Sequence, residues 1–193
     1  SENPVICVPS GNFGNICAGI LAHHRGLPVE HFIAACNVND VVPEYLRTEI
    51  LKPKETVATI SNAMDVGDPS NFVRILELFD KEFNQVKNKL SGYTIDDEET
   101  LKTIKRVEKD YGYVLDPHGA VAFVALEKYL TENDGKGFFL ETAHPVKFPD
   151  SVEQATGKSV EIPKSLEELM KQEKFTTEIN PQYDELKEFL LKK

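Results

Sequence analysis

The sequence contains no tryptophan, only two methionines and only three cysteines among its 193 residues. Cys7, Cys17 and Cys36 are odd in number, form no CxxC pair and lie beside no histidine at a metal-ligand spacing. This pattern argues against a redox pair and a zinc site. We interpret the three cysteines as small buried thiols in a reducing compartment. We therefore expect a cytoplasmic protein without a bound metal.

Positive charge is also scarce. The chain has 22 Lys and Arg residues against 32 Asp and Glu residues, which gives a net charge of −10. Binding to nucleic-acid phosphates requires clustered Lys and Arg, and so does attraction to an anionic membrane surface. A run of about 18 apolar residues, which a membrane-spanning helix needs, is missing as well. We therefore expect no nucleic-acid partner and no membrane partner.

The apolar residues that are present, 40% of the chain, are enough for a core. A chain of this length buries about 70% of the surface of its unfolded state, so it needs no disulfide or metal for stability. We expect the main α/β part to span residues 1–148, with a helical and charged excursion near 70–115. Residues 149–193 are polar and interrupted by prolines, which predicts a C-terminal extension with a terminal helix near Tyr183 to Leu191.

The first 36 residues predict a strand, a helix and a second strand. A short apolar run at 5–8 is closed by Pro9-Ser10-Gly11, as in a buried strand of a parallel sheet. Apolar residues then recur at helical spacing from 13 to 21, and residues 31–36 form a second apolar run. This order favours an α/β fold with a mostly parallel sheet flanked by helices.

Further elements follow from the same patterns. Residues 57–60 and 137–141 predict strands, and helices are predicted after Asp40, after Pro69 and after Asp116. The interleaved acids and bases of residues 80–110 predict solvated helix faces.

The loop Ser10-Gly11-Asn12-Phe13-Gly14-Asn15 lies between the first predicted strand and the first predicted helix. A helix N-terminus carries unpaired backbone N–H groups and partial positive charge. The two glycines allow the backbone to approach a ligand, and the two asparagines add amide donors. These features fit a phosphate site without Lys or Arg, but an ordinary strand-to-helix turn explains them equally well. The loop matches neither the dinucleotide-binding fingerprint nor the P-loop.

Five blocks of sequence point to one family. They are Val8–Asn15 with Ala18-Gly19, Asn37–Asp40 with Tyr45–Thr48, Ser61–Ile75, Asp116–Ala120, and Glu141–Phe148. In this order they resemble the threonine synthases, which are pyridoxal phosphate (PLP) enzymes of fold type II, the tryptophan synthase β-like fold. One departure is Glu49, at a position where the family often has glycine and where a local turn is therefore in question.

The resemblance implies an enzyme that converts O-phosphohomoserine and water into threonine and phosphate, with PLP as the electron sink. It assigns one set of residues to the phosphate group of PLP and a single residue to the ring nitrogen. The phosphate-binding residues are Gly11, Asn12, Phe13, Gly14 and Asn15, and the partner of the ring nitrogen is Thr142.

The lysine that binds PLP as a Schiff base lies, in the family, well upstream of the phosphate loop. No lysine precedes the loop in this sequence. We therefore expect the chain to correspond to the C-terminal part of the enzyme, to need the missing N-terminal part as its partner, and to be inactive alone. Lys147 is not the Schiff-base residue of the family, and we interpret it as a structural or anion-pairing side chain.

Four other polar residues lie in the family-like blocks. His118 and His144 are candidates for proton transfer by residue type, but a hydrogen-bonded structural role is commoner for a histidine beside proline or in a helix cap. Asp65 and Arg74 lie in a polar block, where a place in the substrate cleft and a solvated position fit the sequence equally well.

Two other functions stay open at this point. One is another PLP-dependent lyase or dehydratase of the same fold type, which the blocks at 61–75 and 141–148 disfavour because they resemble threonine synthase more closely. The other is a non-catalytic α/β module that binds a phosphorylated ligand or a partner chain.

Overall fold

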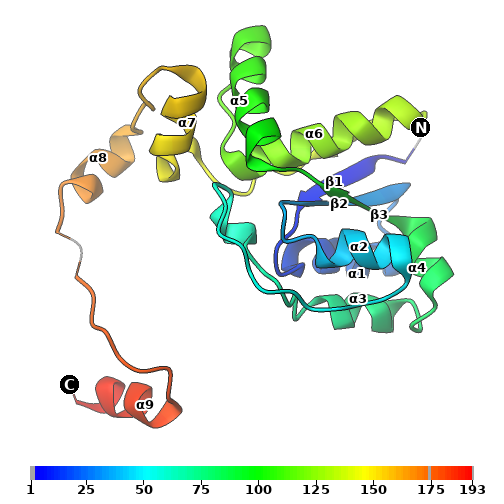
Figure 1. The fold of residues 1–193 in the computed structure, drawn as a ribbon, viewed down its shortest axis with the longest axis horizontal. Helices are drawn as coiled ribbons and strands as arrows, with labels where there is room; N and C mark the ends of the chain where they lie inside the picture. The colour runs from blue at the N-terminus through cyan, green and yellow to red at the C-terminus, as the bar shows by residue number, and fades with distance from the viewer. Residues whose placement is uncertain (1–2, 174, 193) are drawn as a thin grey trace. The chain divides into compact units, whose positions relative to one another are not determined.

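The computed structural model describes residues 3–173 and 175–192 (Figure 1). The chain divides into two compact units, Ser1–Val160 and Glu161–Lys193. The first unit contains the sheet and the cavity described below. Within the described residues of the second unit, α8 (Lys164–Met170) and α9 (Tyr183–Leu191) are helical, and α9 confirms the terminal helix that the sequence predicts. The functional division at residue 148 stays a prediction.

The first unit is built on a four-stranded sheet in the order β3-β2-β1-β4. The strands are β1 (Val5–Pro9), β2 (His31–Cys36), β3 (Leu90–Thr94) and β4 (Gly137–Phe139). Each neighbouring pair is parallel, which confirms an α/β fold with a parallel sheet flanked by helices. β1 and β2 are apolar on both faces because both faces are covered, as is usual for the central strands of a parallel sheet.

Helices cover both faces of this sheet (Figure 1). One face packs against α1 (Gly14–His24), α2 (Val41–Thr48) and α4 (Phe83–Lys89), and α3 (Phe72–Leu78) packs against α1 and α4 in the same apolar cluster. The other face packs against α6 (Pro117–Glu132). Successive side chains of β2 alternate between the two cores: Phe32 and Ala34 belong to the first, and Ile33 and Ala35 belong to the second.

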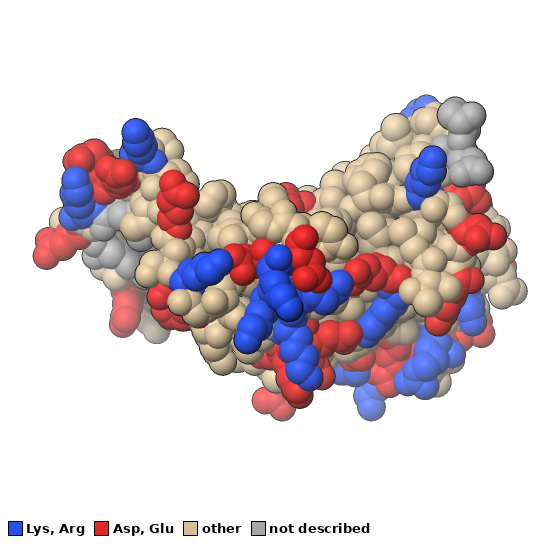
Figure 2. All heavy atoms as spheres, turned by 90° about the horizontal axis from the view of Figure 1, so that it is seen from above, with Lys and Arg blue, Asp and Glu red and all other residues tan. Residues whose placement is uncertain are grey.

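A third apolar cluster joins α6 to α5 (Asp97–Tyr111) and α7 (Pro149–Thr156). The exposed side of α5 carries the interleaved charges that the sequence predicts for a solvated helix face. Lys102 pairs with Glu98 on the same helix, and Lys128 on α6 pairs with Glu99. Figure 2 shows acidic and basic side chains interleaved on this side of the molecule. Exposed pairs of this kind contribute little to stability, about 0–1 kcal/mol each.

Aspartates begin both long helices of this region. The side chain of Asp96 accepts a hydrogen bond from the backbone N–H of Glu99 at the start of α5. The side chain of Asp116 accepts one from the N–H of His118 at the start of α6, and Pro117 occupies the first turn. These bonds satisfy N–H groups that a helix start leaves unpaired. The predicted helix after Asp116 is thereby confirmed.

Two sequence predictions about strands are wrong. Residues 57–60 form no strand, because the backbone N–H groups of Val57 and Thr59 bond to the side chains of Asn39 and Asp65 instead. Residues 90–94, inside the segment predicted as helical, form the edge strand β3. Gly92 allows this strand to lie against α2, since a Cβ atom there would come within 2.8 Å of the Cα atom of Pro43.

All three cysteines are free. Cys7 and Cys36 are buried as predicted, and burial raises the pKa of both thiols. Cys17 differs from the prediction because it lies half-buried on α1. Among the residues described, no helix has the length and hydrophobicity needed to span a membrane.

Candidate functional site

A cavity of about 280 Å³ opens at the carboxyl end of β1. Four segments that are distant in sequence line it. The lining residues are Pro9, Gly11, Asn12, Phe13, Gly14, Asn15, Ala63, Met64, His118 and Thr142. The structure therefore brings together all six residues to which the sequence assigns cofactor binding, and their role in binding stays a prediction.

Three larger hollows, of about 450, 480 and 320 Å³, lie beside α1 and α4, beside α5 and α6, and between α2 and β3. Side chains of helices line the first two, and side chains of α2, α4 and the edge strand β3 line the third. The cavity at β1 is instead lined largely by a glycine-containing loop, and it lies where open parallel sheets bind ligands, beyond the carboxyl ends of the strands. We therefore take the smaller cavity as the candidate site.

Strand pairing explains why Thr142 lies in this cavity. β1 and β4 pair in parallel from Val5 with Gly137 to Cys7 with Phe139, and the N–H of Leu140 donates to the carbonyl of Cys7 at 3.0 Å. The same register, continued, places Thr142 beside Ser10. The two segments meet at one edge of the sheet, as the sequence predicts.

The N-terminus of α1 faces this cavity without a side-chain cap. Within the described part of the chain, no side chain caps the first turn of α1, and no acidic residue lies in that turn. The starts of α5 and α6 are both capped by aspartates, so α1 differs from them. Open N–H groups and partial positive charge at a helix start suit an anion such as a phosphate.

Phe13 turns the chain into α1 in a left-handed conformation, with φ of 62°. This conformation costs a residue other than glycine about 1–2 kcal/mol. The side chain of Phe13 is only 3% exposed and packs edge-on against Phe72, with the ring centroids 5.6 Å apart. Core packing thus holds the strained residue in place. A left-handed residue next to a helix start gathers successive N–H groups into an anion-binding hollow.

The two glycines of the loop differ in how closely the surrounding chain packs against them. A Cβ atom on Gly11 would lie 2.5 Å from the Cα atom of Met64, so only glycine fits against the short helix η1 (Asn62–Met64). A Cβ atom on Gly14 would meet its nearest neighbour, the amide nitrogen of Asn71, at an ordinary 3.7 Å. Packing within this chain therefore demands Gly11, whereas Gly14 keeps the loop open toward the cavity.

The polar side chains of the loop also differ in role. The hydroxyl of Ser10 is buried and donates to the carbonyl of Val8 at 2.8 Å. The amide oxygen of Asn12 accepts a bond from the hydroxyl of Ser70 at 3.0 Å. That bond directs the oxygen of the amide away from an anion and leaves its NH₂ group as a donor.

His118 and Asp116 form the polar wall opposite the loop. Nδ1 of His118 lies 2.6 Å from Oδ1 of Asp116, and Nε2 accepts a bond from the backbone N–H of Ala63 at 3.2 Å. The ring is therefore neutral, with its proton on Nδ1, and both of its nitrogens are engaged. Of the two roles that the sequence allows for His118, this geometry favours the hydrogen-bonded structural one.

Burial opposes the ionisation of Asp116, but the hydrogen bonds from the ring and the N–H of His118 outweigh this effect and lower the pKa of Asp116. Glu141 has the opposite shift. Its carboxyl group lies over Gly119 on α6, where burial and the nearby Asp116 raise the pKa of Glu141 to about 8. Glu141 therefore turns toward α6 while Thr142 lines the cavity, as expected for adjacent residues at the end of a strand.

Sequence reasoning missed the roles of Asp116 and Glu141 at this wall. The available signal was the spacing Asp-Pro-His, which places a helix cap two residues before a histidine whose ring can fold back on it. Nothing in the sequence pattern links this motif to Ala63.

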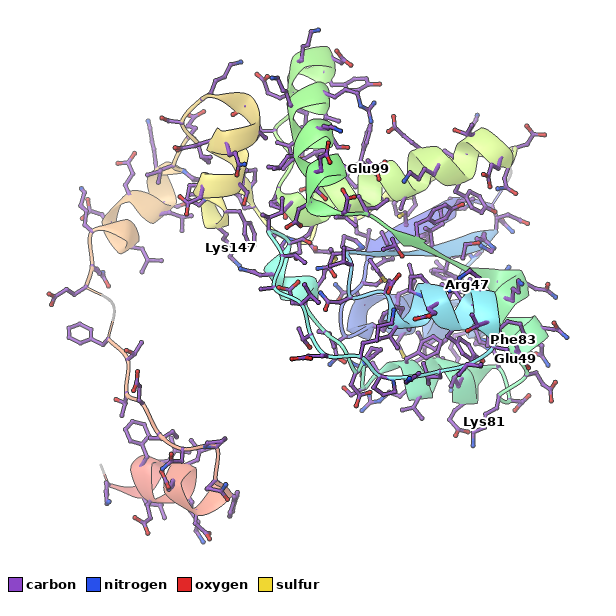
Figure 3. The ribbon with its side chains drawn as sticks, in the orientation of Figure 1. Arg47, Glu49, Lys81, Phe83, Glu99 and Lys147 are labelled. Atoms are coloured by element: carbon purple, nitrogen blue, oxygen red, sulfur yellow. The ribbon has the colours of Figure 1, made fainter. Side chains whose placement is uncertain are left out.

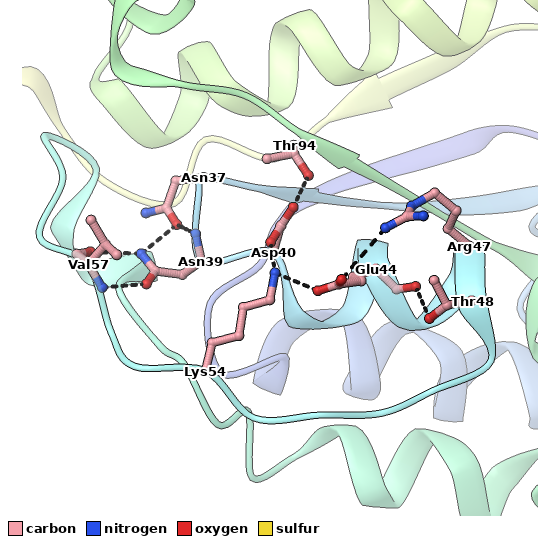
Figure 4. Close-up of polar contacts among 9 residues, drawn as sticks. All are labelled: Asn37, Asn39, Asp40, Glu44, Arg47, Thr48, Lys54, Val57 and Thr94. Carbon is pink, nitrogen blue, oxygen red and sulfur yellow. Dashed lines mark hydrogen bonds and ion pairs between the residues drawn. The ribbon is translucent and has the colours of Figure 1, made fainter.

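Asp65 holds a loop in place and does not line the cavity. Its Oδ1 accepts bonds from Asn37 at 2.8 Å and from the hydroxyl of Thr59 at 2.7 Å. Figure 4 shows the adjoining part of this network, in which Asn39 bonds to both the N–H and the carbonyl of Val57. Asn37 and Asn39 follow β2 directly, so the network ties the long connection before η1 to the sheet.

The same connection is held at its other end by charge. The ammonium group of Lys54 lies 2.6 Å from a carboxylate oxygen of Asp40 and 2.6 Å from one of Glu44 (Figure 4). Both anchors fix the segment that carries Ala63 and Met64 into the cavity.

The remaining candidates lie outside the described lining of the cavity. Arg74 is exposed on α3, and Lys147 is exposed on the short helix η2 (Pro145–Lys147), where Figure 3 labels it. Nδ1 of His144 accepts a bond from the N–H of Val146 at 3.1 Å and so caps η2. This geometry favours the structural role for His144.

Known proteins match both the sequence and the fold. A family model described as "Pyridoxal-phosphate dependent enzyme" matches residues 2–138, and one described as "Threonine synthase, C-terminal" matches residues 119–190. Threonine synthase from Buchnera aphidicola subsp. Acyrthosiphon pisum is 44% identical over 192 residues, which are 100% of this chain and 44% of that protein.

Two solved structures extend the match to three dimensions. The crystal structure of threonine synthase from Escherichia coli superposes with a TM-score of 0.89 at 43% identity, over 98% of this chain and 44% of that one. PLP-bound threonine synthase from Brucella melitensis superposes with a TM-score of 0.86 at 29% identity, over 98% of this chain and 46% of that one. The chain thus spans less than half the length of these relatives. These matches show that it belongs to the pyridoxal-phosphate dependent enzyme family, in which it is similar to the C-terminal part of the threonine synthases.

Proposed function

We propose that this chain is the part of a threonine synthase that holds the phosphate group and the ring of PLP. The complete enzyme would convert O-phosphohomoserine and water into threonine and phosphate. The observation that carries the proposal is the cavity in which the uncapped start of α1 and the side chain of Thr142 meet. The similarity of the whole chain to threonine synthases supports it.

The residues of the cavity fit PLP. The phosphate group would accept hydrogen bonds from the N–H groups of Gly11–Asn15 and from the amide of Asn12. None of the described lining residues is acidic, so no carboxylate on this wall repels the phosphate. When bound, PLP supplies an electron sink that no amino-acid side chain offers.

Thr142 would bond to the ring nitrogen of PLP. A carboxylate at this position would stabilise a protonated ring, because an opposite charge favours the charged form. A hydroxyl gives no such stabilisation and can donate to an unprotonated nitrogen. The neighbouring carboxyl of Glu141 is turned toward Gly119 and away from the cavity, which leaves the hydroxyl of Thr142 as the partner.

We propose further that the Schiff-base lysine comes from the part of the enzyme that this chain does not cover. The chain spans 44% of the relative from Buchnera aphidicola, and no lysine is among the described residues that line the cavity. In this arrangement the chain binds and orients the cofactor, and the remaining part completes the cleft. The chain alone would be inactive.

Gly14 provides a test of the phosphate site. An aspartate at this position has room and adds a negative charge at the start of α1, whereas an asparagine adds the same volume without the charge. In the complete enzyme that contains this chain, Gly14→Asp should weaken PLP binding by about 100-fold relative to Gly14→Asn, because like charges a few ångströms apart repel strongly. A titration of the apoenzyme with PLP, followed by protein fluorescence, measures this. Equal affinities of the two variants would place the phosphate elsewhere.

A further inference from the structure

One carboxylate oxygen beside the cavity wall lacks a partner. Asp116 is fully buried, and its Oδ1 accepts two bonds from His118, but its Oδ2 has none within the described structure. Burying an ionised oxygen without a donor is costly, so a donor is expected nearby. The wall residues need this carboxylate, because it orients the ring of His118.

The carboxyl group of Glu141 lies near Asp116 and can supply that donor when it is protonated. The Glu141 carboxyl group lies so close to Gly119 that a Cβ atom on Gly119 would overlap it. Gly119 is in the first turn of α6, which begins at Pro117, directly after Asp116. Part of Glu141 remains exposed, but its carboxyl end faces Asp116. Two carboxyl groups that share one site do not both ionise readily, so one of them retains a proton.

We propose that Glu141 donates a carboxylic proton to Oδ2 of Asp116 and so completes a relay of hydrogen bonds that positions the wall of the cofactor cavity. Asp116 then holds the ring of His118. The ring in turn holds the N–H of Ala63. No covalent bond is made or broken in this relay, and its members are positioning residues.

The last step of the relay reaches the phosphate loop. The carbonyl oxygen of Ala63 lies 3.1 Å and the Cα atom of Met64 lies 2.5 Å from the position of a Cβ atom on Gly11. A displacement of Ala63 therefore moves the segment against which the loop rests. This inference rests on the proposed function, because the wall in question is that of the proposed PLP site.

The relay makes cofactor binding depend on pH. The pKa of Glu141 is raised to about 8 by burial and by Asp116, so Glu141 keeps its proton at neutral pH and loses it above pH 8. The other titratable groups that face the pair are His118, already bonded, and Tyr113. Burial and then the two carboxyl groups raise the pKa of Tyr113, so it does not compete in this range. Above pH 8 the two carboxylates repel each other, so Asp116 loses the hydrogen bond from Glu141 and positions the ring of His118 less firmly.

The test compares Glu141→Gln with wild type and with a matched control, Glu127→Gln, in the complete enzyme that contains this chain. Glu127 also lies on the α6 side of the molecule but pairs with Arg106. The probe is pyridoxine 5′-phosphate, which has no aldehyde and cannot bond to a lysine. Between pH 7 and pH 9, the affinity of wild type and of Glu127→Gln for the probe should fall about tenfold more than that of Glu141→Gln, whose amide donates at every pH. Ionisation of the probe itself affects all three proteins equally, so it cancels when their affinities are compared.

Infrared difference spectroscopy supplies a readout without the cofactor. The wild-type spectrum minus the Glu141→Gln spectrum should contain the C=O band of a protonated carboxylic acid at pH 7, and the band should disappear with a midpoint near pH 8. Absence of the band at pH 7, or parallel affinity profiles for all three proteins, would overturn the relay. Failure of wild type to bind the probe at any pH would overturn the proposed function instead.

Discussion

At the scale of single residues, four described residues other than glycine have the positive φ that glycine favours, and two of them, Phe13 and Glu49, illustrate different reasons for it. Phe13 has φ of 62° at the mouth of the cavity, and its buried ring keeps it there. Glu49 has φ of 64° at the end of α2 and is exposed. Strain at Phe13 shapes a loop that lines the cavity, whereas strain at Glu49 only ends a helix.

Replacing Glu49 by glycine should stabilise the protein. Its N–H bonds to the carbonyl of Tyr45 and closes α2, a place where glycine avoids the steric penalty of a Cβ atom (Figure 3 labels the residue). We expect Glu49→Gly to raise the free energy of unfolding by about 1 kcal/mol, measured by urea denaturation. Glu49→Ala removes the charge but keeps the Cβ atom, so it should not stabilise. An equal gain in both variants would assign the effect to charge.

In the function that we propose, Thr142 is the residue that recognises the ring of PLP. In the complete enzyme we expect Thr142→Val to lower kcat/KM by about tenfold, the value of one lost hydrogen bond, and to shift the absorbance of bound PLP. Thr142→Ser retains the hydroxyl and should retain both properties. Unchanged turnover and an unchanged spectrum in Thr142→Val would leave Thr142 with a structural role alone.

At the scale of elements, the starts of the helices separate into two kinds. α5 and α6 begin with capping aspartates that satisfy their first N–H groups. The other α-helices have no side-chain cap among the described residues, and of these α1 is the one whose first residues line the cavity. An uncapped helix start is a cost to the fold unless a ligand satisfies it, which is why a bound phosphate should stabilise this region.

Removing the cap of α5 should lower the stability of the protein without changing its affinity for PLP. Asp96→Ala removes the acceptor for the N–H of Glu99 and should lower the free energy of unfolding by about 1 kcal/mol. The affinity of the complete enzyme for PLP should not change, because α5 does not line the cavity within the described residues. Asp96→Asn keeps an acceptor and should cost less. A loss of PLP affinity in Asp96→Ala would show that α5 supports the site.

At the scale of the whole molecule, we propose that the chain supplies one wall of a cleft. Its cavity gathers backbone donors and a hydroxyl but no lysine within the described lining. Its relatives are more than twice as long as the matched segment. The division of labour that we propose therefore places recognition of the cofactor in this chain and the nucleophile outside it.

This division predicts that the purified 193-residue chain does not release phosphate from O-phosphohomoserine above a control without enzyme, because the proposed Schiff-base lysine lies outside it. PLP should bind to the chain weakly, since in this proposal the chain supplies only part of the cleft. The complete enzyme should turn over the substrate and should lose that activity when its upstream lysine is changed to alanine. Turnover by the isolated chain would refute the division.

The sequence by itself determined the unit from β1 to β2 and the loop within it. Two apolar runs, at 5–8 and 31–36, and the helical spacing from 13 to 21 are local patterns. The helix satisfies its backbone hydrogen bonds internally, and the continuous apolar runs indicate strands that are buried on both faces. The ordered blocks also identified the family, because they carry residue identities that packing alone does not require.

Only the tertiary structure decided the remaining features. β3 became a strand because it pairs with β2, which overrode the charged, helix-like composition around it. Residues 57–60 gave their backbone bonds to Asn39 and Asp65 rather than to a neighbouring strand. The wall of the cavity joins Ala63 to His118, and the register of β4 on β1 brings Thr142 to the loop Ser10–Asn15. These last two contacts connect residues 55 or more positions apart, and no local sequence pattern encodes such pairings.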